Sequence, residues 1–508
     1  MFTDVELIIQ LLDGLPLALS QAGSYLGETN MTVSDYLKSY KDLWADLMKK
    51  QDKFLLQEYG YRSILTTWMM SYNQVRTQSE EAANFLKLWA FLDSRDVWYE
   101  LVACAAELDS SMRPPEWLLR MAKNRLEFFD VMRLLSRYSL ADARTEAASF
   151  SMHSVLHEWC YQLCEDNEDI ELFRVSSSLV AMMVPSENDR QFWVLMKRLL
   201  PHGSRVYELF VEKVSVKAEE SAKLDLPGWV FNELGTLFAD QRKLAEGEKM
   251  FKLAAVHETK LEPDSSCFPN AMMGLGRLYH EGGKVDEAEK MWKRALAGYE
   301  KALEPDHPQT LMVVQNLGLL YHGRGKFEEA EKMWKRALTG YEKALEPDHP
   351  QTLAVVQNLG MLYHGRGNVE EAEKMWKRAL AGYEKALEPD HPDTLRVVQN
   401  LGLLYHGRGK FEEAEKMLKR AMEGYRNYGR SKEREFSDTA YNLGNIYEET
   451  LLFDKAEAAF ECAVRGYETL LGPDDPETLE AITRLTSLRK KRNISRQTGW
   501  TKILRQIF

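Results

Sequence analysis

The chain has 508 residues, 44% of them hydrophobic, which is enough for more than one buried core. It carries 66 Lys and Arg against 78 Asp and Glu, a net charge of −12, which argues against general binding to nucleic acid. The N-terminus lacks a basic stretch and no run of about 18 apolar residues occurs, so we expect neither a signal peptide nor contact with a membrane.

The first motif in the chain is Gly-Leu-Pro-Leu-Ala at residues 14–18. Asp13 and Gly14 favour a turn, and Pro16 suits the first turn of an apolar helix that runs towards Leu26. The motif resembles a box of the same sequence in NB-ARC nucleotide switches, a family of plant disease-resistance proteins, apoptosis scaffolds and many fungal proteins. We therefore interpret residues 1–58 as a helical remnant of an NB-ARC domain.

A second motif, Phe-Ser-Met-His-Ser-Val-Leu-His, occupies residues 150–157. The residues before it predict helices that end in a hairpin, with strands at Ser139–Ala143 and Ala148–Met152. The motif resembles the Met-His-Asp box of NB-ARC proteins, with Ser154 in place of Asp. The order of helices, hairpin and box is similar to the winged-helix subdomain of that family, which we expect over residues 59–165.

The resemblance implies that Pro16 contacts a nucleotide base and that His153 reaches the phosphate of ADP. However, the chain has no Gly-x-x-x-x-Gly-Lys-Ser/Thr loop to hold phosphate groups, and the acidic strand that positions Mg²⁺ in the family is missing. Because positioning of phosphate and metal supplies nearly all of the catalysis, we expect no enzymatic activity. We expect no cofactor, with ADP or ATP bound only if an upstream phosphate loop is supplied. Pro16 is then a plain helix start and His153 a buried histidine at a strand-to-helix junction.

His153, His157, Cys160 and Cys164 fall on one stripe of a helix. One straight helix rarely supplies four tetrahedral ligands, so we interpret the stripe as facing a core and predict no metal site. The five cysteines are odd in number and scattered, which suits a reducing compartment, and we expect a cytoplasmic protein. Residues 166–228 are expected to form a helical linker.

Residues 229–471 repeat with a period of 42 residues, and units 313–354 and 355–396 differ at only six positions. A Leu-Gly pair marks each of six units, with the leucines at Leu234, Leu275, Leu317, Leu359, Leu401 and Leu443. A catalytic pocket needs different groups at one point, whereas a repeat supplies the same group along a line. The pattern predicts six helix-turn-helix units that stabilise one another by stacking.

Small residues, Gly318 and Ala330, indicate where the two helices of a unit cross closely. The His-Gly-Arg-Gly sequence at 322–325 ends the first helix, because glycine adopts left-handed backbone angles at little cost. Asp348 is the expected cap of the next unit, with Pro350 in the first turn of its helix. The pattern resembles tetratricopeptide repeats, and the Asp-His-Pro-x-Thr-Leu link resembles the 42-residue repeats of kinesin light chains. We therefore predict a mainly α fold, in which a winged-helix-like region precedes an α-α superhelical solenoid.

In the tetratricopeptide family, the first helix of each unit lines a concave groove, and an asparagine before the Leu-Gly pair binds peptide. The resemblance places this role on Asn316, Asn358, Asn400 and Asn442, while the first two units have Glu233 and Gly274. Glutamines precede three of these asparagines, at Gln315, Gln357 and Gln399, and histidines lie further along the same helices, at His322, His364 and His406. An amide can both donate to and accept from a peptide bond, so the row suits an extended segment of a partner. The alternative is that these groups only solvate the surface, and that the histidines are ordinary helix-end residues.

Residues 472–490 have the pattern of a capping helix that begins at Pro476. The basic sequence of 491–508 predicts a disordered tail, with a surface amphipathic helix as the alternative.

We interpret the chain as the C-terminal part of a fungal NLR-like protein of the NB-ARC (STAND) class. The expected function is recognition of a protein or peptide, possible self-association included, by the repeats as the sensor half of a signalling switch. The alternatives are a cargo adaptor of the kinesin light chain type, for which no N-terminal heptads are visible, and a nucleotide-hydrolysing switch.

Overall fold

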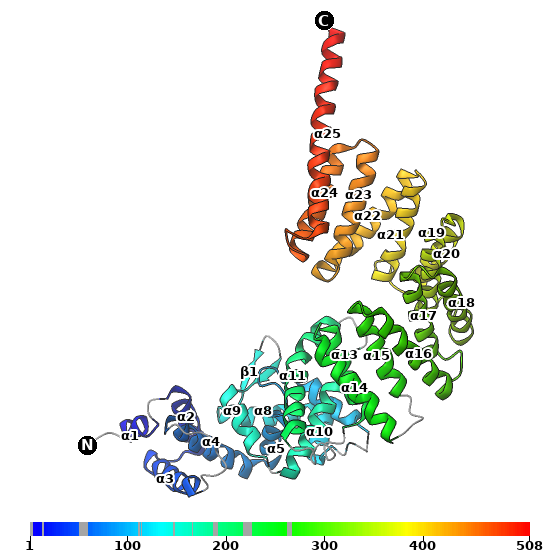
Figure 1. The fold of residues 1–508 in the computed structure, drawn as a ribbon. Helices are drawn as coiled ribbons and strands as arrows, with labels where there is room; N and C mark the ends of the chain where they lie inside the picture. Colours follow the sequence, from blue (N-terminus) through cyan, green and yellow to red (C-terminus); the bar gives the residue numbers. More distant parts are fainter. Residues whose placement is uncertain are drawn as a thin grey trace. The chain divides into compact units, whose positions relative to one another are not determined.

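The computed structural model describes residues 4–12, 15–49, 59–109, 112, 114–145, 148–164, 166–185, 192–216, 226–261 and 267–507. These residues are mainly helical and divide into two compact units, 1–288 and 289–508, each of which is described by itself. Consecutive helices pack in pairs along the repeats (Figure 1), so the expected mainly α solenoid is confirmed. The expected turn at Asp13 and Gly14 lies outside the described residues.

The first part of unit 1 is a group of helices with one small sheet. The helices are α1 (Asp4–Leu11), α2 (Pro16–Thr29), α3 (Val33–Lys49), α4 (Tyr59–Gln78), α5 (Glu80–Trp89), α6 (Tyr99–Ala103), the 3-10 helix η2 (Cys104–Glu107), α7 (Glu116–Lys123), α8 (Arg125–Arg137), α9 (Ser154–Gln162), α10 (Asp166–Met182) and α11 (Phe192–Val216). Strands β1 (Asp142–Arg144) and β2 (Ser149–Ser151) pair antiparallel, with Ala143 opposite Phe150. Val97 adds a bridge to Phe150 on the other side of β2.

Both strands of this hairpin are shorter than the sequence predicts. Ser139 adopts a left-handed φ of 52°, and the N–H of Leu140 donates to the carbonyl of Leu135 at 2.9 Å, so these residues close the end of α8. Ala148 has a φ of 47° and belongs to the turn before β2. The expected first strand, 139–143, therefore began three residues too early and ended one residue too soon, because the turn that closes α8 takes up its first residues. The expected second strand, 148–152, was one residue too long at each end.

Helix α2, which Pro16 begins, packs against the turn after α8. The amide of Gln21 donates to the carbonyl of Ser139 at 2.9 Å, and the hydroxyls of Ser24 and Ser139 lie 2.6 Å apart. Gln21 is fully buried at this contact. The motif of residues 14–18 thus leads into a helix fixed on the region that carries the hairpin.

Residues of the expected linker, 166–228, pack tightly rather than spanning a gap. His202 of α11 is fully buried, accepts from the N–H of Asp93 through Nδ1 at 3.0 Å, and places Nε2 2.8 Å from the carbonyl oxygen of Asp96. Burial lowers the pKa of His202 to about 4. Arg198 donates to both oxygens of Asp96 and lies over the ring of Trp98, so α11 is fixed to the segment 93–98.

The repeats follow, and each predicted unit contains a first helix and a second, longer helix. They are α13 (Gly228–Asp240), α14 (Leu244–Leu261), α15 (Cys267–Glu281), α16 (Val285–Ala302), α17 (Pro308–Gly323), α18 (Phe327–Ala344), α19 (Pro350–Gly365), α20 (Val369–Ala386), α21 (Pro392–Gly407), α22 (Phe411–Asn427), the 3-10 helix η5 (Gly429–Lys432), α23 (Glu433–Glu449) and α24 (Phe453–Leu470). Unit 2 begins within α16.

The turn inside each repeat depends on the second glycine of His-Gly-Arg-Gly. Gly325, Gly367 and Gly409 have φ values of 70°, 76° and 70°, which L-residues rarely adopt. The last repeat has Leu451 at the matching position, and it takes the same conformation with a φ of 61°.

The glycine of the Leu-Gly pair lets the two helices of a repeat approach. A Cβ on Gly360 would lie 2.5 Å from Nε1 of Trp376, and Gly318 meets Trp334 in the same way. The indole N–H of Trp376 donates to the carbonyl of Gln357 at 3.1 Å. These tryptophans are buried between the helices, as the spacing predicts.

Three units, those that begin with α17, α19 and α21, start with a histidine cap, and not with the aspartate that the sequence suggested. Nδ1 of His349 accepts from the N–H of Gln351 at 3.2 Å, and Pro350 occupies the first position of α19. Asp348 instead forms an ion pair at 2.5 Å with Lys385 of α20, the second helix of the same unit. The expected cap was wrong by one residue because an imidazole nitrogen can accept the same bond as a carboxylate.

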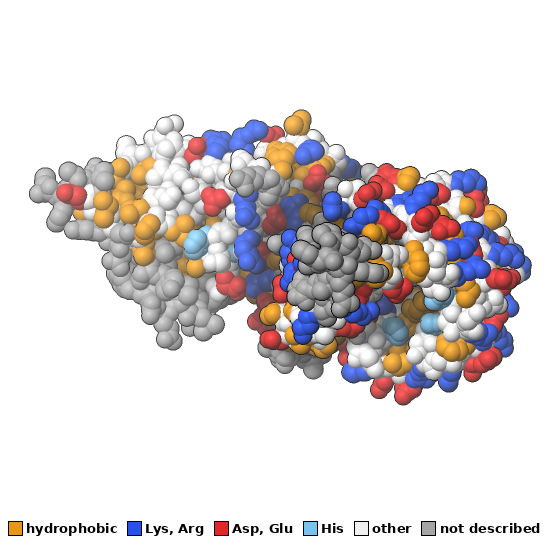
Figure 2. All heavy atoms as spheres, turned by 90° about the horizontal axis from the view of Figure 1, so that it is seen from above, with side chains coloured by type: hydrophobic (Ala, Val, Ile, Leu, Met, Phe, Trp, Pro, Cys, Tyr) orange, Lys and Arg blue, Asp and Glu red, His pale blue; other side chains and the backbone are white. Residues whose placement is uncertain are grey.

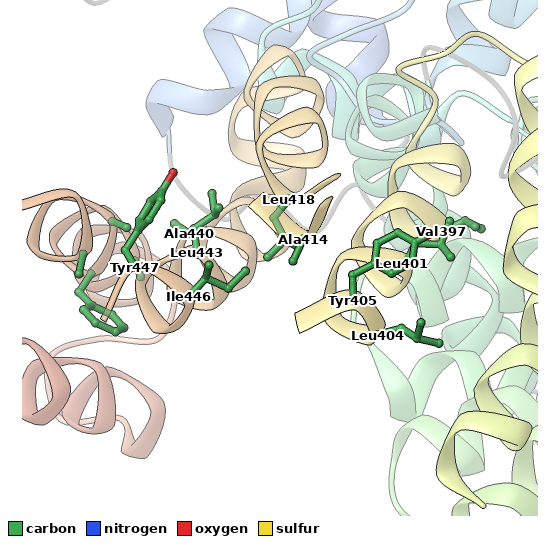
Figure 3. Close-up of a cluster of buried hydrophobic side chains, with 14 of the residues drawn as sticks. Val397, Leu401, Leu404, Tyr405, Ala414, Leu418, Ala440, Leu443, Ile446 and Tyr447 are labelled. Carbon is green, nitrogen blue, oxygen red and sulfur yellow. The ribbon is translucent and has the colours of Figure 1, made fainter. Parts of the chain in front are cut away.

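Neighbouring repeats share one core and one set of ion pairs. Leu401, Leu404 and Tyr405 of α21 belong to the same buried cluster as Leu443 and Ile446 of α23 (Figure 3). Outside this core, each carboxylate of a recurring series meets an arginine and a tyrosine from the next repeat. Glu331 of α18, for example, accepts from Arg366 of α19 at 2.6 Å and contacts Tyr363. The same contacts recur at Glu289 with Arg324 and at Glu373 with Arg408.

The chain ends in one long helix, α25 (Pro476–Ile507), whose first part packs on α24. Arg489 donates to Glu457 at 2.7 Å and forms a second ion pair with Glu461. The expected disordered tail at 491–508 is wrong, because the helix continues through Ile507 and extends beyond the last pair (Figure 1).

Candidate interaction surface

Three consecutive first helices, α17, α19 and α21, present the same polar group at the same point. Asn316, Asn358 and Asn400 are each partly exposed on these helices. The side chains of Asn358 and Asn400 make no hydrogen bond to any residue that the structure describes, so both amides are available to a ligand. We call the surface formed by positions 312, 315, 316, 319 and 322 and their equivalents in the next two units the amide face.

The glutamines beside these asparagines are held more tightly. Gln357 is only 7% exposed, and its Oε1 has no partner among the described residues. In the next unit, Leu418 stands where the tryptophan was, and Oε1 of Gln399 accepts from the hydroxyl of Tyr425 at 3.4 Å. Gln315 is partly exposed. The three predicted glutamines therefore differ in availability.

An apolar row lies one helical turn beyond the amides. Leu319 is 39% exposed, which is unusual for leucine in a packed helix, and Met361 and Leu403 at the equivalent positions are partly exposed. Figure 2 shows orange hydrophobic side chains beside pale blue histidines on the face it presents, whereas lysine, arginine and carboxylate side chains intermingle elsewhere.

The histidine row packs on the second helix of its own repeat. The ring of His322 lies 5.7 Å from that of Trp334 and 5.6 Å from that of Phe327, and the ring of His364 lies 5.5 Å from Trp376. Burial lowers the pKa of His322, so it is neutral near pH 7. His406 differs, because its Nε2 lies 3.0 Å from a carboxylate oxygen of Glu449.

The amide face carries no unbalanced charge. Among its positions in residues 308–407, all of which are described, the charged side chain is Arg396, which forms an ion pair with Asp393 of its own helix. The long helices carry the charges instead, in pairs such as Arg378 with Glu342 at 2.6 Å.

The row changes character at both ends. In the first two units, Glu233 is largely buried, which raises its pKa, and Gly274 lies where a Cβ would come 2.3 Å from the ring of Phe251. In the last unit, Asn442 is partly exposed, but Glu448 stands where the others have histidine and pairs with Lys491 of α25 at 2.6 Å. The uniform neutral row therefore covers α17, α19 and α21.

The two residues that the NB-ARC resemblance singled out lie at the starts of different helices. Pro16 is exposed at the first position of α2, where the preceding Leu15 supplies no side-chain cap. His153 is exposed and caps α9, its Nδ1 accepting from the N–H of Val155 at 3.3 Å. The expectation of a buried His153 was wrong; the buried histidine of this helix is His157, whose Nε2 lies 3.0 Å from the carbonyl oxygen of Trp89.

The two members of the stripe that lie within α9, His157 and Cys160, are buried and serve packing. Cys160 is fully buried with its sulfur 4.0 Å from that of Met152, and burial raises the pKa of the thiol. Within the described ranges, no group of three or more His, Cys, Asp and Glu side chains is placed to hold a metal ion. A search of the same residues finds no helix with both the length and the apolar content to cross a bilayer.

Models of the tetratricopeptide repeat match residues 268–343, 311–367, 352–427 and 437–477. These stretches of the chain are tetratricopeptide repeats. Repeats of this kind form protein–protein interaction modules. A comparison with curated protein sequences gave no match.

Among solved structures, the chain is similar to a STAND ATPase from Pyrococcus horikoshii with a tetratricopeptide repeat sensor. The two are 15% identical with a TM-score of 0.54, over 93% of this chain and 63% of that one. A Podospora anserina protein with nearly identical TPR-like repeats, described as a candidate kinesin light chain, is 24% identical with a TM-score of 0.34, over 39% of this chain and 95% of that one. BtubC from P. vanneervenii is 22% identical with a TM-score of 0.39, over 46% of this chain and 92% of that one.

Sequence reasoning did not separate the unpartnered amides of Asn358 and Asn400 from the engaged amide of Gln399. Both are amides at adjacent positions, and only the substitution of Trp by Leu418 in one unit hinted that the surroundings of Gln399 differ. It also missed the ion pairs between repeats, although the 42-residue recurrence of Tyr, Arg and Glu was visible in the sequence.

Proposed function

We propose that the chain binds a partner polypeptide along the amide face of its tetratricopeptide repeats. The observation that supports this proposal is the row of asparagine amides on α17, α19 and α21, of which Asn358 and Asn400 have no hydrogen-bond partner among the described residues. A side-chain amide offers a donor and an acceptor to a peptide bond, and the adjacent apolar row offers contact to side chains.

The test compares two double variants of the full chain in a pull-down. Asn358→Ala with Asn400→Ala is expected to lose bound protein that the unaltered chain retains, at an unchanged melting temperature. The matched control, Gln351→Ala with Asn427→Ala, removes two exposed amides outside the face and is expected to retain it. Equal retention by both double variants would contradict the proposal.

We further propose that this module is the recognition half of an NB-ARC-type, NLR-like signalling protein. Three observations support the proposal: the box at residues 14–18, the Met-His box before α9, and the similarity of 93% of the chain to the STAND protein with a repeat sensor. In that role the chain itself hydrolyses no nucleotide, because it has no phosphate loop.

Two measurements test this second proposal. The gene upstream of the codon for Met1 is expected to encode a phosphate loop in the same reading frame, and a complete reading frame without one would contradict it. Labelled ADP is expected not to bind the 508-residue chain, and micromolar binding would show that Pro16 and His153 act without the loop.

A further inference from the structure

We propose that the amide face is a set of three equivalent subsites for an uncharged polyproline II segment with an apolar side chain at every third residue. This inference rests on the proposed binding function and adds the conformation, period and charge of the ligand. A partner that repeats the triplet would occupy several subsites at once.

The equivalence of the subsites follows from the repeats. Units 313–354 and 355–396 differ at six positions, and on the amide face they differ by Leu319 against Met361 and by position 354 against 396. Each subsite has an asparagine amide and, one turn further, an apolar side chain that is at least partly exposed, Leu319, Met361 or Leu403. The asparagine and the apolar side chain therefore recur in every subsite, whereas the residue at 312, 354 and 396 changes from Met to Ala to Arg.

The charge of the face selects an uncharged segment. Between residues 308 and 407, Arg396 is the charged residue of the face, and Asp393 neutralises it. Except beside Glu449, whose carboxylate contacts His406 at the third subsite, a lysine or carboxylate of a ligand would lose hydration here and gain no opposite charge. The apolar and amide groups of an uncharged ligand, in contrast, would contact the apolar and amide side chains of the face.

The spacing of the subsites selects the conformation. Helix α17 contacts α19, and helices in contact lie about 10 Å apart, so successive subsites are separated by about that distance. A polyproline II segment advances about 9 Å in three residues and completes one turn, which returns every third side chain to the same side. A β-strand also advances about 10 Å in three residues, but its third side chain points to the opposite side. The polyproline II segment therefore matches both the distance and the direction.

The asparagines suit the same ligand. A polyproline II helix makes no internal hydrogen bonds, so its carbonyl groups remain free to accept. The amides of Asn358 and Asn400 have no hydrogen-bond partner among the described residues and can donate to them.

The experiment titrates the full chain with synthetic peptides whose ends are acetylated and amidated. The probes contain one or three Pro-Pro-Leu triplets, and two controls contain three Pro-Pro-Pro-Leu blocks or three Pro-Pro-Glu triplets. Three Pro-Pro-Leu triplets are expected to bind more than about tenfold tighter than one, because the second and third contacts form within one complex. The control with a period of four and the charged control are expected to bind at least about tenfold more weakly than three Pro-Pro-Leu triplets.

Variants of the chain test the equivalence. Leu319→Glu, Met361→Glu and Leu403→Glu are each expected to weaken binding of the three-triplet peptide by a similar factor, while Ala381→Glu, at an exposed position of α20, leaves it unchanged. Equal affinity for periods of three and four, no dependence on the number of triplets, or no binding of any peptide would overturn the inference. If no peptide binds but the Asn358→Ala, Asn400→Ala variant still loses its partner, this inference fails while the proposed function stands.

Discussion

Backbone conformation at single residues limits the stability of this array. Gly367 adopts a φ of 76°, and a Cβ at this position would have open space around it. Glycine is therefore favoured there by its backbone conformation and not by a close contact. Leu451 occupies the same place in the last repeat with a φ of 61°, and its side chain is 69% exposed. A left-handed conformation costs a non-glycine residue about 1–2 kcal/mol.

Replacing this leucine with glycine is expected to stabilise the protein. Leu451→Gly relieves the strain at no loss of packing, and the greater freedom of glycine in the unfolded chain offsets part of the gain, which leaves about 0.5–1 kcal/mol. Gly367→Ala, the reverse change, is expected to destabilise by about 1 kcal/mol. Urea unfolding of both variants measures the effects, and a destabilised Leu451→Gly protein would contradict the account.

Close approach of two helices makes a different glycine indispensable. Gly360→Ala places a Cβ 2.5 Å from Nε1 of Trp376 and is expected to destabilise by about 1–3 kcal/mol. Gly365→Ala, five residues later in the same helix, meets nothing within 4 Å and is expected to be neutral or slightly stabilising. Thermal unfolding distinguishes the two, and equal melting temperatures would show that the helix pair shifts to accept the methyl group.

At the scale of the helices, the spacing of residues predicted which segments pair, but not how their ends are closed. Leu359, Gly360 and Trp376 recur at helical positions, and a packed core follows from that pattern alone. His349 rather than Asp348 caps α19 through a local hydrogen bond that either residue type could make. The turn before β1 likewise depends on a local hydrogen bond, from Leu140 to Leu135. The positions of the asparagines on the amide face follow from the repeat period, whereas the engagement of Gln399 by Tyr425 depends on which side chain fills the space beside it.

The carboxylates between repeats are expected to make folding sensitive to acid. A hydrogen bond from Lys335, and then the charges of Lys335 and Arg366, lower the pKa of Glu331 below its ordinary value of 4.5. A carboxyl group with a lowered pKa stabilises the folded state above 4.5 and loses this contribution as the pH falls through the lowered value. The same holds for Glu289, Glu373 and Glu415.

Glu331→Gln is therefore expected to destabilise at neutral pH and to converge with the unaltered chain at an acid pH below the lowered pKa of Glu331. Denaturant unfolding at both pH values measures the difference. Glu329→Gln, at an exposed position of the same helix, is the control and is expected to follow the unaltered chain. A constant difference between Glu331→Gln and the unaltered chain at both pH values would mean that the loss is not electrostatic.

At the scale of the whole molecule, each middle repeat packs chiefly on the repeats beside it, so stability is close to a sum over repeats. Deleting residues 355–396 joins residue 354 to residue 397 and restores the same contacts, because the deleted unit and the one before it differ at six positions. The shortened chain is expected to unfold cooperatively, with a denaturant dependence reduced roughly in proportion to the surface removed. Deleting only 355–375 joins unlike helices and is expected to prevent a cooperative transition. Circular dichroism during urea unfolding tests both deletions.

The packing of α25 on α24 has a consequence for how such a gene can change. Because Ala481, Leu485 and Leu488 of α25 belong to the same buried cluster as Phe460 and Val464 of the final pair, the apolar end of the stack stays covered whatever number of units precedes it. Unequal recombination between the almost identical coding segments can thus change the number of middle repeats without exposing an apolar surface that would cause aggregation. Recognition of longer or shorter targets could then diverge between close relatives in a single genetic event.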